Sequence, residues 1–437
     1  MLIKFSVENW QSFRDEAVIS MIASREQQHQ DRLAKIDKYK MRLLPLAAIY
    51  GGNASGKTKF FNALEFVQRF VVRVTQPESA IPREYFRLDK EYANKPTKFN
   101  FEILVDNICY GFSFSVTQRE VVEEKLTEIS SHSEKILYYR VKGKKIDFSN
   151  DSKLKSDNRL RFVADGTRDN QLFLTASIDQ KIEYFQTIYD WFKHKLVLIT
   201  PETAFVGVGY YFEENNPVSS SMNDILAKLD TGITRLGGVD VPIDSIQMLE
   251  SVKIKLLEEI PEGGSVPLLH HSGGRVVISK SNGLISAKRL VSYHASIDGK
   301  ETLFEMNNES AGTLRTIDIL PVFYDLCDHK DSKIYVVDEI DRCLHTMMTQ
   351  ALIEKYLQSC SSSTRSQLLF TTHDLLLMDQ DLLRRDEIWI TERDNNGCSS
   401  IISLGDYKGV RYDKDIRKSY LKGSFGGIPK ILLSAHN

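Results

Sequence analysis

A glycine-rich loop at residues 51–58 constrains this 437-residue chain more than any other feature. The sequence LPLAAIYGGNASGKT at residues 44–58 starts as a buried apolar strand and ends in this loop. One apolar helical face follows, formed by Phe61, Leu64, Val67 and Val71. Gly51, four further residues and then Gly56-Lys57-Thr58 have the spacing of a phosphate-binding loop, whose backbone N–H groups surround phosphate oxygens at the positive end of a helix.

Two side chains of this loop have specific tasks. Lys57 would reach the β- and γ-phosphates of a nucleotide, and the Thr58 hydroxyl would hold Mg²⁺. A chance glycine turn before a helix is the alternative, but the strand–loop–helix context favours phosphate binding. We therefore expect ATP and Mg²⁺ as cofactors, with the candidate binding residues Gly51, Asn53, Ala54, Ser55, Gly56, Lys57 and Thr58.

Composition excludes few functions. The 57 basic and 59 acidic residues nearly cancel, so net charge gives no argument for nucleic-acid binding, although a local basic patch is not excluded. The five cysteines lie far apart without metal-ligand spacing, which fits free thiols in a reducing compartment. The N-terminus lacks a signal-peptide core, and no apolar stretch approaches the roughly 20 residues that span a bilayer. We expect a soluble cytoplasmic protein.

The order of strands and helices predicts the fold class. Two alternating runs within residues 98–117, separated by Asp106-Asn107, predict a β-hairpin. From Glu305 onward strands alternate with helices, which implies a parallel sheet shared with the phosphate loop. We predict an α/β fold with a mixed or parallel sheet, an antiparallel β subdomain and an α+β insertion. The predicted parts are an N-terminal lobe at 1–180, the insertion at 181–304 and a C-terminal lobe at 305–437.

Two helices are predicted from apolar periodicity. Residues 171–196 read as a helix that leads to the short apolar strand at 196–200. A second helix in the insertion carries apolar residues from Ile243 to Leu256. Sustained heptads and internal repeats are lacking, so a long coiled coil is not expected.

The second informative stretch is KIYVVDEIDRCLH at residues 333–345, an apolar strand that ends in two carboxylates. Asp338 at the strand tip is placed to bind Mg²⁺ through water, and Glu339 can polarise an attacking water as a general base. Adjacent acids after a strand are common by chance. A phosphate loop in the same chain favours the catalytic interpretation.

Two further motifs each have a structural and a functional interpretation. His373 ends the strand in QLLFTTHD, and its position on the strand after the acidic pair favours a sensor of the γ-phosphate over a structural histidine. Ser310 and Gly312, in NNESAGTLR, stand at a helix start. They can bind a terminal phosphate supplied by another subunit, or Ser310 can be an ordinary N-cap.

The motif order GGNASGKT, ESAGT, VVDEID and TTHD resembles the heads of ABC-type ATPases of the SMC, RecN and OLD kinds. More closely, the chain resembles the bacterial single-chain ABC-type ATPases described as AAA15-like. Further shared segments are VENWQSFRDE, VEEKL, LDTGI, LLRRDEIW and YLKGSFGGIP at 420–429. The resemblance covers nearly the whole chain and is weakest at 133–170 and 240–300.

This resemblance implies a role for each motif residue in an ATP site shared by two chains. The implied roles are phosphate and magnesium binding for Lys57 and Thr58, magnesium binding for Asp338, catalytic base for Glu339, switch for His373, action in trans for Ser310 and Gly312, and a dimer-contact loop for Asp341. It also implies a homodimer or higher homo-oligomer with ATP between the heads.

The sequence departs from the family pattern in two places. The signature reads SAG instead of the SGG of transporters, as in the non-transporter branch. No motif supplies the lid glutamine that would join the metal site, and Gln180 is the candidate for it. The apolar runs at residues 2–7 and 17–22 predict a two-stranded ribbon at the start of the chain, and Arg14, in this N-terminal ribbon, is a candidate phosphate contact.

Several functions are compatible with these motifs. The resemblance implies a sensor or regulatory ATPase of a bacterial anti-phage defence system, similar to the ATPases of PARIS-, retron- and Septu-type systems. Such an ATPase would control a separately encoded effector, expected to be a nuclease. The expected trigger is a phage protein or DNA. An SMC/RecN-like ATPase of DNA repair is the alternative, disfavoured by the missing heptad arms. An OLD-type nuclease would need a Toprim domain, for which too few residues follow TTHD. SMC-like heads do not couple to membrane domains, so a transporter is disfavoured.

Overall fold

The computed structural model describes residues 1–148, 151–203, 217–229, 231–246, 248–269, 274–407 and 415–428. The chain divides into two compact units. Unit 1 consists of Met1–Thr200, His329–Ile340 and Glu354–Asn437, and unit 2 of Pro201–Asp328 and Asp341–Ile353. This division differs from the predicted boundaries after residues 180 and 304, because residues 181–200 belong to unit 1 and residues 305–328 to unit 2.

A mixed sheet of six strands forms the centre of unit 1. Three of its inner strands are buried along their whole length and mostly apolar, as expected for parallel strands covered on both faces. The order is β10 (Leu196–Ile199), β16 (Ile334–Val337), β17 (Gln367–Thr371), β5 (Leu46–Tyr50), β18 (Ile388–Arg393) and β19 (Ser399–Ser403), parallel except for β19. The strand before the phosphate loop therefore shares a sheet with the C-terminal strands, and this prediction is confirmed.

The second sheet of unit 1 is antiparallel. The hairpin at Asp106 and Asn107 turns with φ of 49° and 61°, the left-handed geometry that two-residue hairpin loops require. The strand order is β2 (Ala17–Ser20), β1 (Leu2–Glu8), β6 (Thr97–Val105), β7 (Ile108–Val116), β8 (Val121–Ile129) and β9 (Glu134–Val141), and a separate ribbon pairs β3 (Ala34–Ile36) with β4 (Met41–Leu43). The predicted hairpin and N-terminal ribbon are confirmed.

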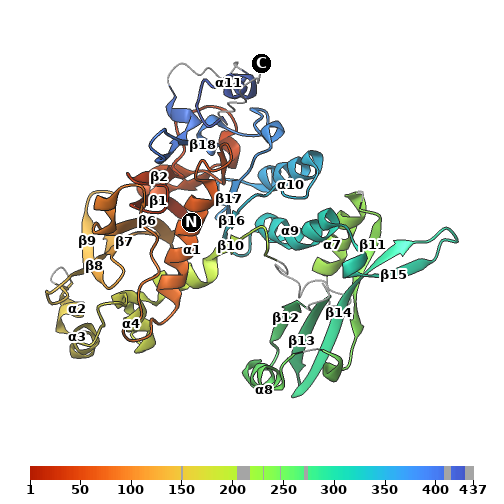
Figure 1. Cartoon of the computed structure of the whole chain (residues 1–437), viewed down its shortest axis with the longest axis horizontal. Coiled ribbons are helices and arrows are strands. Elements are labelled where there is room, and N and C mark those ends of the chain that lie inside the picture. Colours follow the sequence, from red (N-terminus) through yellow and green to blue (C-terminus); the bar gives the residue numbers. More distant parts are fainter. Residues whose placement is uncertain are drawn as a thin grey trace, which may run out of the picture. The chain divides into compact units, whose positions relative to one another are not determined.

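Helix α1 (Lys57–Val72) shares one apolar core with strands of both sheets. Figure 1 shows it beside β1 and β6, and the rings of Phe5 and Phe60 meet at 5.2 Å. The other helices with residues in unit 1 are α2 (Ser152–Ser156), α3 (Asn158–Asp165), α4 (Phe173–Asp179), α5 (Gln186–Asp190), α11 (Ile416–Leu421) and the second half of α10 (Thr346–Ser359). None of the helices described in either unit is both long and apolar enough to cross a membrane.

The continuous helix predicted over residues 171–196 is wrong. Lys181 adopts a left-handed conformation (φ 56°) that ends α4, and the Ile182 amide turns back to the Ser177 carbonyl at 2.8 Å. This turn buries Ile182 and Phe185, so apolar burial outweighs helical continuity. In the insertion, residues 243–245 form a 3₁₀ turn and the helix proper begins only at Glu250.

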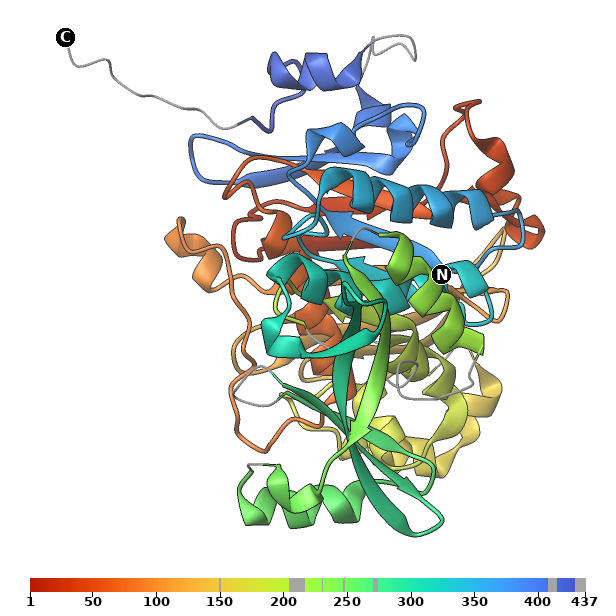
Figure 2. The same cartoon turned by 90° about the vertical axis from the view of Figure 1, so that its right-hand side faces the viewer.

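Unit 2 contains a third, antiparallel sheet and the helices around it (Figure 2, green). A buried ion pair fastens one of its strands to a helix, since Arg275 Nη2 lies 2.8 Å from Asp318 Oδ2. The strands are β11 (Ile233–Asp240), β14 (Leu284–Ala295), β13 (Arg275–Ser281), β12 (Ser265–Leu269) and β15 (Glu301–Glu305), and the helices α7 (Pro217–Lys228), α8 (Glu250–Glu259) and α9 (Ala311–Asp328). The predicted α+β character of the insertion is confirmed.

Candidate active site

The phosphate loop joins the end of β5 to the start of α1. Gly56 immediately precedes the helix with φ 122°, and a Cβ on it would lie 2.8 Å from Ser399 Oγ and 3.1 Å from the Phe13 ring. Only glycine fits this backbone and this space. The N-terminal turn packs on the same region, because Trp10 Nε1 donates to the Lys59 carbonyl at 2.9 Å.

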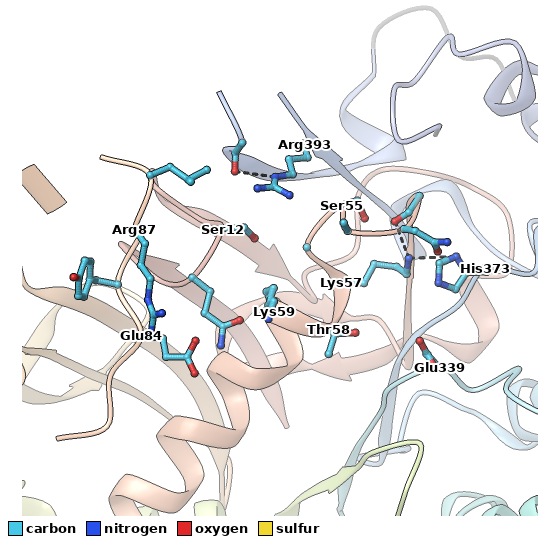
Figure 3. Close-up of a pocket in the computed structure, with 18 residues that line it drawn as sticks. Ser12, Ser55, Lys57, Thr58, Lys59, Glu84, Arg87, Glu339, His373 and Arg393 are labelled. Atoms are coloured by element: carbon cyan, nitrogen blue, oxygen red, sulfur yellow. Dashed lines mark hydrogen bonds between the residues drawn. The ribbon is translucent and has the colours of Figure 1, made fainter. Parts of the chain in front are cut away.

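Lys57 is held by the loop that it belongs to. Its Nζ donates to the Gly51 carbonyl at 2.6 Å and to the Gly52 carbonyl at 3.2 Å. The same Nζ lies 3.4 Å from His373 Nδ1, so the loop lysine and the predicted switch histidine meet (Figure 3). The lysine side chain is buried against the loop while its charge faces the cavity described below.

Strand β18 is hydrogen-bonded to the phosphate loop and to the end of β5. Its Thr391 Oγ1 lies 2.6 Å from Ser55 Oγ and donates to the Tyr50 carbonyl at 3.1 Å. The pairing of Ile390 with Tyr50 in the parallel sheet brings these groups together. Ser55 therefore supports the loop from inside the protein, and it also lines the cavity.

The acidic pair follows β16 as predicted, and one threonine of β17 holds both members. Thr371 Oγ1 donates to Asp338 Oδ1 at 2.5 Å and accepts from the Glu339 amide at 2.8 Å. Glu339 has φ 49°, a left-handed conformation that is uncommon outside glycine and clusters at functional sites. The turn directs the Glu339 side chain into the cavity, whereas Asp338 stays behind it with 2% exposure.

A cavity of about 550 Å³ in unit 1 brings together Lys57, Thr58, Glu339 and His373. This volume lies in the usual range for cofactor sites. Figure 3 shows Glu339 and His373 at one end, and Glu84 and Arg87 at the other. The remaining lining residues are Gln11, Ser12, Gly52, Asn53, Ala54, Ser55, Gly56, Lys59, Tyr85, Leu88, Arg393 and Gly397.

Part of the lining of this cavity was not predicted from the sequence. Arg87 lies in a connection without any motif, and Arg393 ends β18. A signal for Arg393 existed, because a strand placed next to β5 delivers its last residue beside the phosphate loop. Gln11 and Ser12 belong to the NWQSF turn that the family resemblance had included.

The groups at the loop fit a nucleotide phosphate with Mg²⁺. Lys57 is a cation at the start of a helix, where backbone N–H groups and the helix dipole favour anions. The exposed Thr58 hydroxyl and the carboxylate of Asp338 are the oxygen donors that Mg²⁺ prefers, and phosphate oxygens complete such sites. Thr58 and Asp338 would therefore hold the ion.

Two sequence candidates lie elsewhere. Gln180 follows α4 on the surface, where its carbonyl accepts from Arg159 Nη2 at 2.8 Å, and it does not line the cavity. Arg14 pairs with Asp15 at 2.8 Å and does not line the cavity either. The structure therefore does not support Gln180 as a lid glutamine or Arg14 as a phosphate contact, because local bonds fix both residues outside the cavity.

The signature residues belong to unit 2. Ser310 Oγ accepts from the Thr313 amide at 3.0 Å, which is N-cap geometry for α9. A Cβ on Gly312 would lie 2.7 Å from the Cys343 carbonyl, so glycine lets the helix start pack on the loop that follows Asp341. The structure brings the signature and the predicted dimer-contact loop together, while their action in trans stays a prediction.

A phosphate loop between a buried strand and a helix, facing a carboxylate at the end of another strand of the same sheet, defines a P-loop nucleotide-binding protein. The family model "AAA domain, putative AbiEii toxin, Type IV TA system" matches residues 46–379. The chain belongs to this family of AAA-type ATPases, as the sequence resemblance implied.

Similar solved structures are SMC heads. The SMC head domain from Thermotoga maritima has 11% identity and a TM-score of 0.34, with 92% of this chain and 98% of that chain covered. The "SmcHead bound to the C-winged helix domain of ScpA" has 13% identity and a TM-score of 0.36, with 92% and 97% covered. No curated protein matches the chain.

Thr371→Val tests the arrangement of the acidic pair. The substitution removes the hydroxyl that bonds both Asp338 and the Glu339 amide, so we expect release of phosphate from Mg-ATP to fall about 100-fold, as for a misplaced catalytic group. Thr371→Ser keeps the hydroxyl and should retain turnover close to the original rate. Turnover of the valine variant at the rate of the serine variant would contradict this role of Thr371.

Proposed function

We propose that this protein binds and hydrolyses Mg-ATP as the sensor and regulatory ATPase of a bacterial anti-phage defence system, in which it controls a separately encoded effector. The observation that carries the ATPase part is the gathering of Lys57, Thr58, Glu339 and His373 around one cavity. These are the groups for phosphate binding, metal binding, water activation and γ-phosphate sensing, respectively.

In this mechanism Lys57 exchanges the carbonyls of Gly51 and Gly52 for the β- and γ-phosphates. Thr58 and Asp338 would hold Mg²⁺, which would supply positive charge to neutralise the phosphate oxygens. Glu339 accepts a proton from the attacking water, and the bond from its amide to Thr371 fixes the direction of its side chain. His373 lies one hydrogen-bond length from Lys57 Nζ, so a γ-phosphate bound by the lysine also comes within its reach.

The defence role rests on the motif order and its resemblance to ATPases of PARIS-, retron- and Septu-type systems. We found no nuclease motif in the sequence. We therefore assign nucleic-acid cleavage to a separately encoded partner, the nuclease effector. A phage protein or DNA is the proposed trigger.

Lys57→Ala and Glu339→Gln separate binding from turnover. Removing the loop cation should abolish binding of a fluorescent ATP analogue, whereas removing the base should preserve binding and lower phosphate release by about 100-fold or more. Both quantities are measured in Mg²⁺ on purified protein. Full turnover by the Glu339→Gln variant would exclude Glu339 as the base.

We further propose that two chains enclose two ATP molecules, with Ser310 and Gly312 of one chain facing Lys57 of the other. The start of a helix has N–H groups that do not pair within the helix and a positive dipole, which suit an anion brought by a partner. Because ATP would bind the closed dimer preferentially, it should promote association by mass action.

Ser310→Arg should block this association while leaving ATP binding near normal. The test is mass by light scattering in the Glu339→Gln background with and without ATP, together with hydrolysis by the single Ser310→Arg variant. Thr302→Arg, at an exposed position of β15, introduces the same charge as a control. Normal hydrolysis and an unchanged mass response of Ser310→Arg would reject the shared site.

The defence assignment is tested in cells that carry the gene with its flanking genes. We expect Lys57→Ala and Glu339→Gln to change phage plating relative to the unaltered locus, since the effector would lose its ATP-dependent control. Sensitivity to DNA-damaging agents is measured in parallel. Unchanged plating combined with new damage sensitivity would favour the DNA-repair alternative.

A further inference from the structure

We propose that residues 415–428, the C-terminal clasp, are a positioning element of the ATP site that sets the affinity of the phosphate loop for ATP. The clasp includes most of the YLKGSFGGIP segment, to which no role has been assigned so far; Pro429 of that segment lies outside the described residues. This inference rests on the proposed binding of ATP. In this proposal Tyr420 and Gly427 affect ATP binding indirectly, by positioning the phosphate loop.

The clasp contacts the phosphate loop at one backbone group. The Gly52 amide donates to the Gly427 carbonyl at 2.6 Å, and the buried Tyr420 hydroxyl donates to the same carbonyl at 2.8 Å. A carbonyl oxygen has two lone pairs, so it can accept both bonds. Tyr420 thereby holds the acceptor in place for the loop.

Gly52 is fixed at both of its backbone groups. Its amide is bonded to the clasp, and its carbonyl accepts from Lys57 Nζ and from the Ser55 amide, each at 3.2 Å. The Gly52 amide shares a planar peptide group with the Gly51 carbonyl, which accepts from Lys57 Nζ at 2.6 Å. A shift of Gly427 would rotate this peptide and with it the Gly51 carbonyl that holds the lysine. The clasp thus controls the position from which Lys57 must reach a phosphate.

Only glycine permits this contact at residue 427. Gly427 has φ 71°, and a Cβ on it would lie 2.7 Å from Ile390 Cγ2 and 3.2 Å from the Thr391 carbonyl. Those neighbours belong to β18, which is paired with β5 and does not move easily. Packing against β18 therefore explains the second glycine of SFGGIP, for which the sequence motifs of the ATPase gave no reason.

The clasp makes two further side-chain hydrogen bonds. Arg417 Nη2 donates to Asp379 Oδ2 at 3.3 Å, and Asp379 belongs to the segment that follows His373. The Tyr407 hydroxyl donates to the Phe425 carbonyl at 2.7 Å, which fixes the turn before the double glycine. One element is therefore bonded to the loop of Lys57 and to the segment that follows the switch histidine.

The test uses Tyr420→Phe, which removes only the hydroxyl. We expect the KM for ATP to rise about fivefold, the effect of one lost buried hydrogen bond, with kcat within about twofold because Glu339 and Thr371 are not touched. The matched control is Tyr356→Phe, which loses a buried hydroxyl bonded to the carbonyls of Pro45 and Ser366. The control should lower the melting temperature by a similar amount but leave KM unchanged.

Gly427→Ala provides a second, stronger variant. We expect its KM to rise about tenfold or more, because the added methyl group displaces the carbonyl from Gly52. Tyr420→Phe should then have no further effect in the Gly427→Ala background, since both substitutions act through the same carbonyl. Additive effects of the two substitutions would overturn the proposal.

The outcomes separate the clasp from the proposed function. If the unaltered protein binds ATP but Tyr420→Phe and Gly427→Ala both keep its KM, the clasp proposal is wrong and the ATPase proposal stands. An equal rise of KM in Tyr356→Phe would also overturn it, because the effect would then be general destabilisation. If the unaltered protein binds no ATP, the proposed function itself fails.

Discussion

The site depends on one constraint, the parallel pairing of β16, β17, β5 and β18. This pairing brings the C-terminal ends of these four strands to one edge of the sheet. At this edge two buried threonines, Thr371 of β17 and Thr391 of β18, bond to groups on neighbouring segments. A threonine hydroxyl both donates and accepts, so Thr371 can serve Asp338 and the Glu339 amide at once. The phosphate loop and the acidic pair are therefore oriented by neutral side chains that take no part in the chemistry.

The charge of Lys57 is held in a way that suits its proposed task. Two carbonyl groups of its own loop, those of Gly51 and Gly52, accept from the ammonium group. Hydrogen bonds between two ionised groups are stronger than those from a cation to a neutral carbonyl, so a phosphate can replace these partners. The carbonyls also keep the side chain close to the cavity before ATP binds, which reduces the ordering cost of binding.

The sequence predicted those parts of the fold and site that local patterns encode. Apolar runs flanked by glycine or acids identified β5 and β16, and the conformation of Glu339 agrees with a carboxylate turned out of its strand. Arg87 could not be predicted, because its position depends on packing between segments far apart in sequence. Gln180 does not line the cavity, and the left-handed turn at Lys181 beside it was not predicted because no residue type in that stretch signals it.

The two residues of the signature motif, Ser310 and Gly312, differ in whether contacts within one chain explain them. Gly312 is explained within one chain by its contact with the Cys343 carbonyl, so the glycine alone is no argument for a second chain. Ser310 differs, because its hydroxyl accepts from the Thr313 amide and lies 2.9 Å from Thr313 Oγ1. If Thr313 is the donor in that second contact, the Ser310 proton is free to point outward to an anion. N-capping and phosphate binding by Ser310 are then compatible. The argument for the proposed site shared with a second chain therefore rests on the Ser310 hydroxyl and not on Gly312.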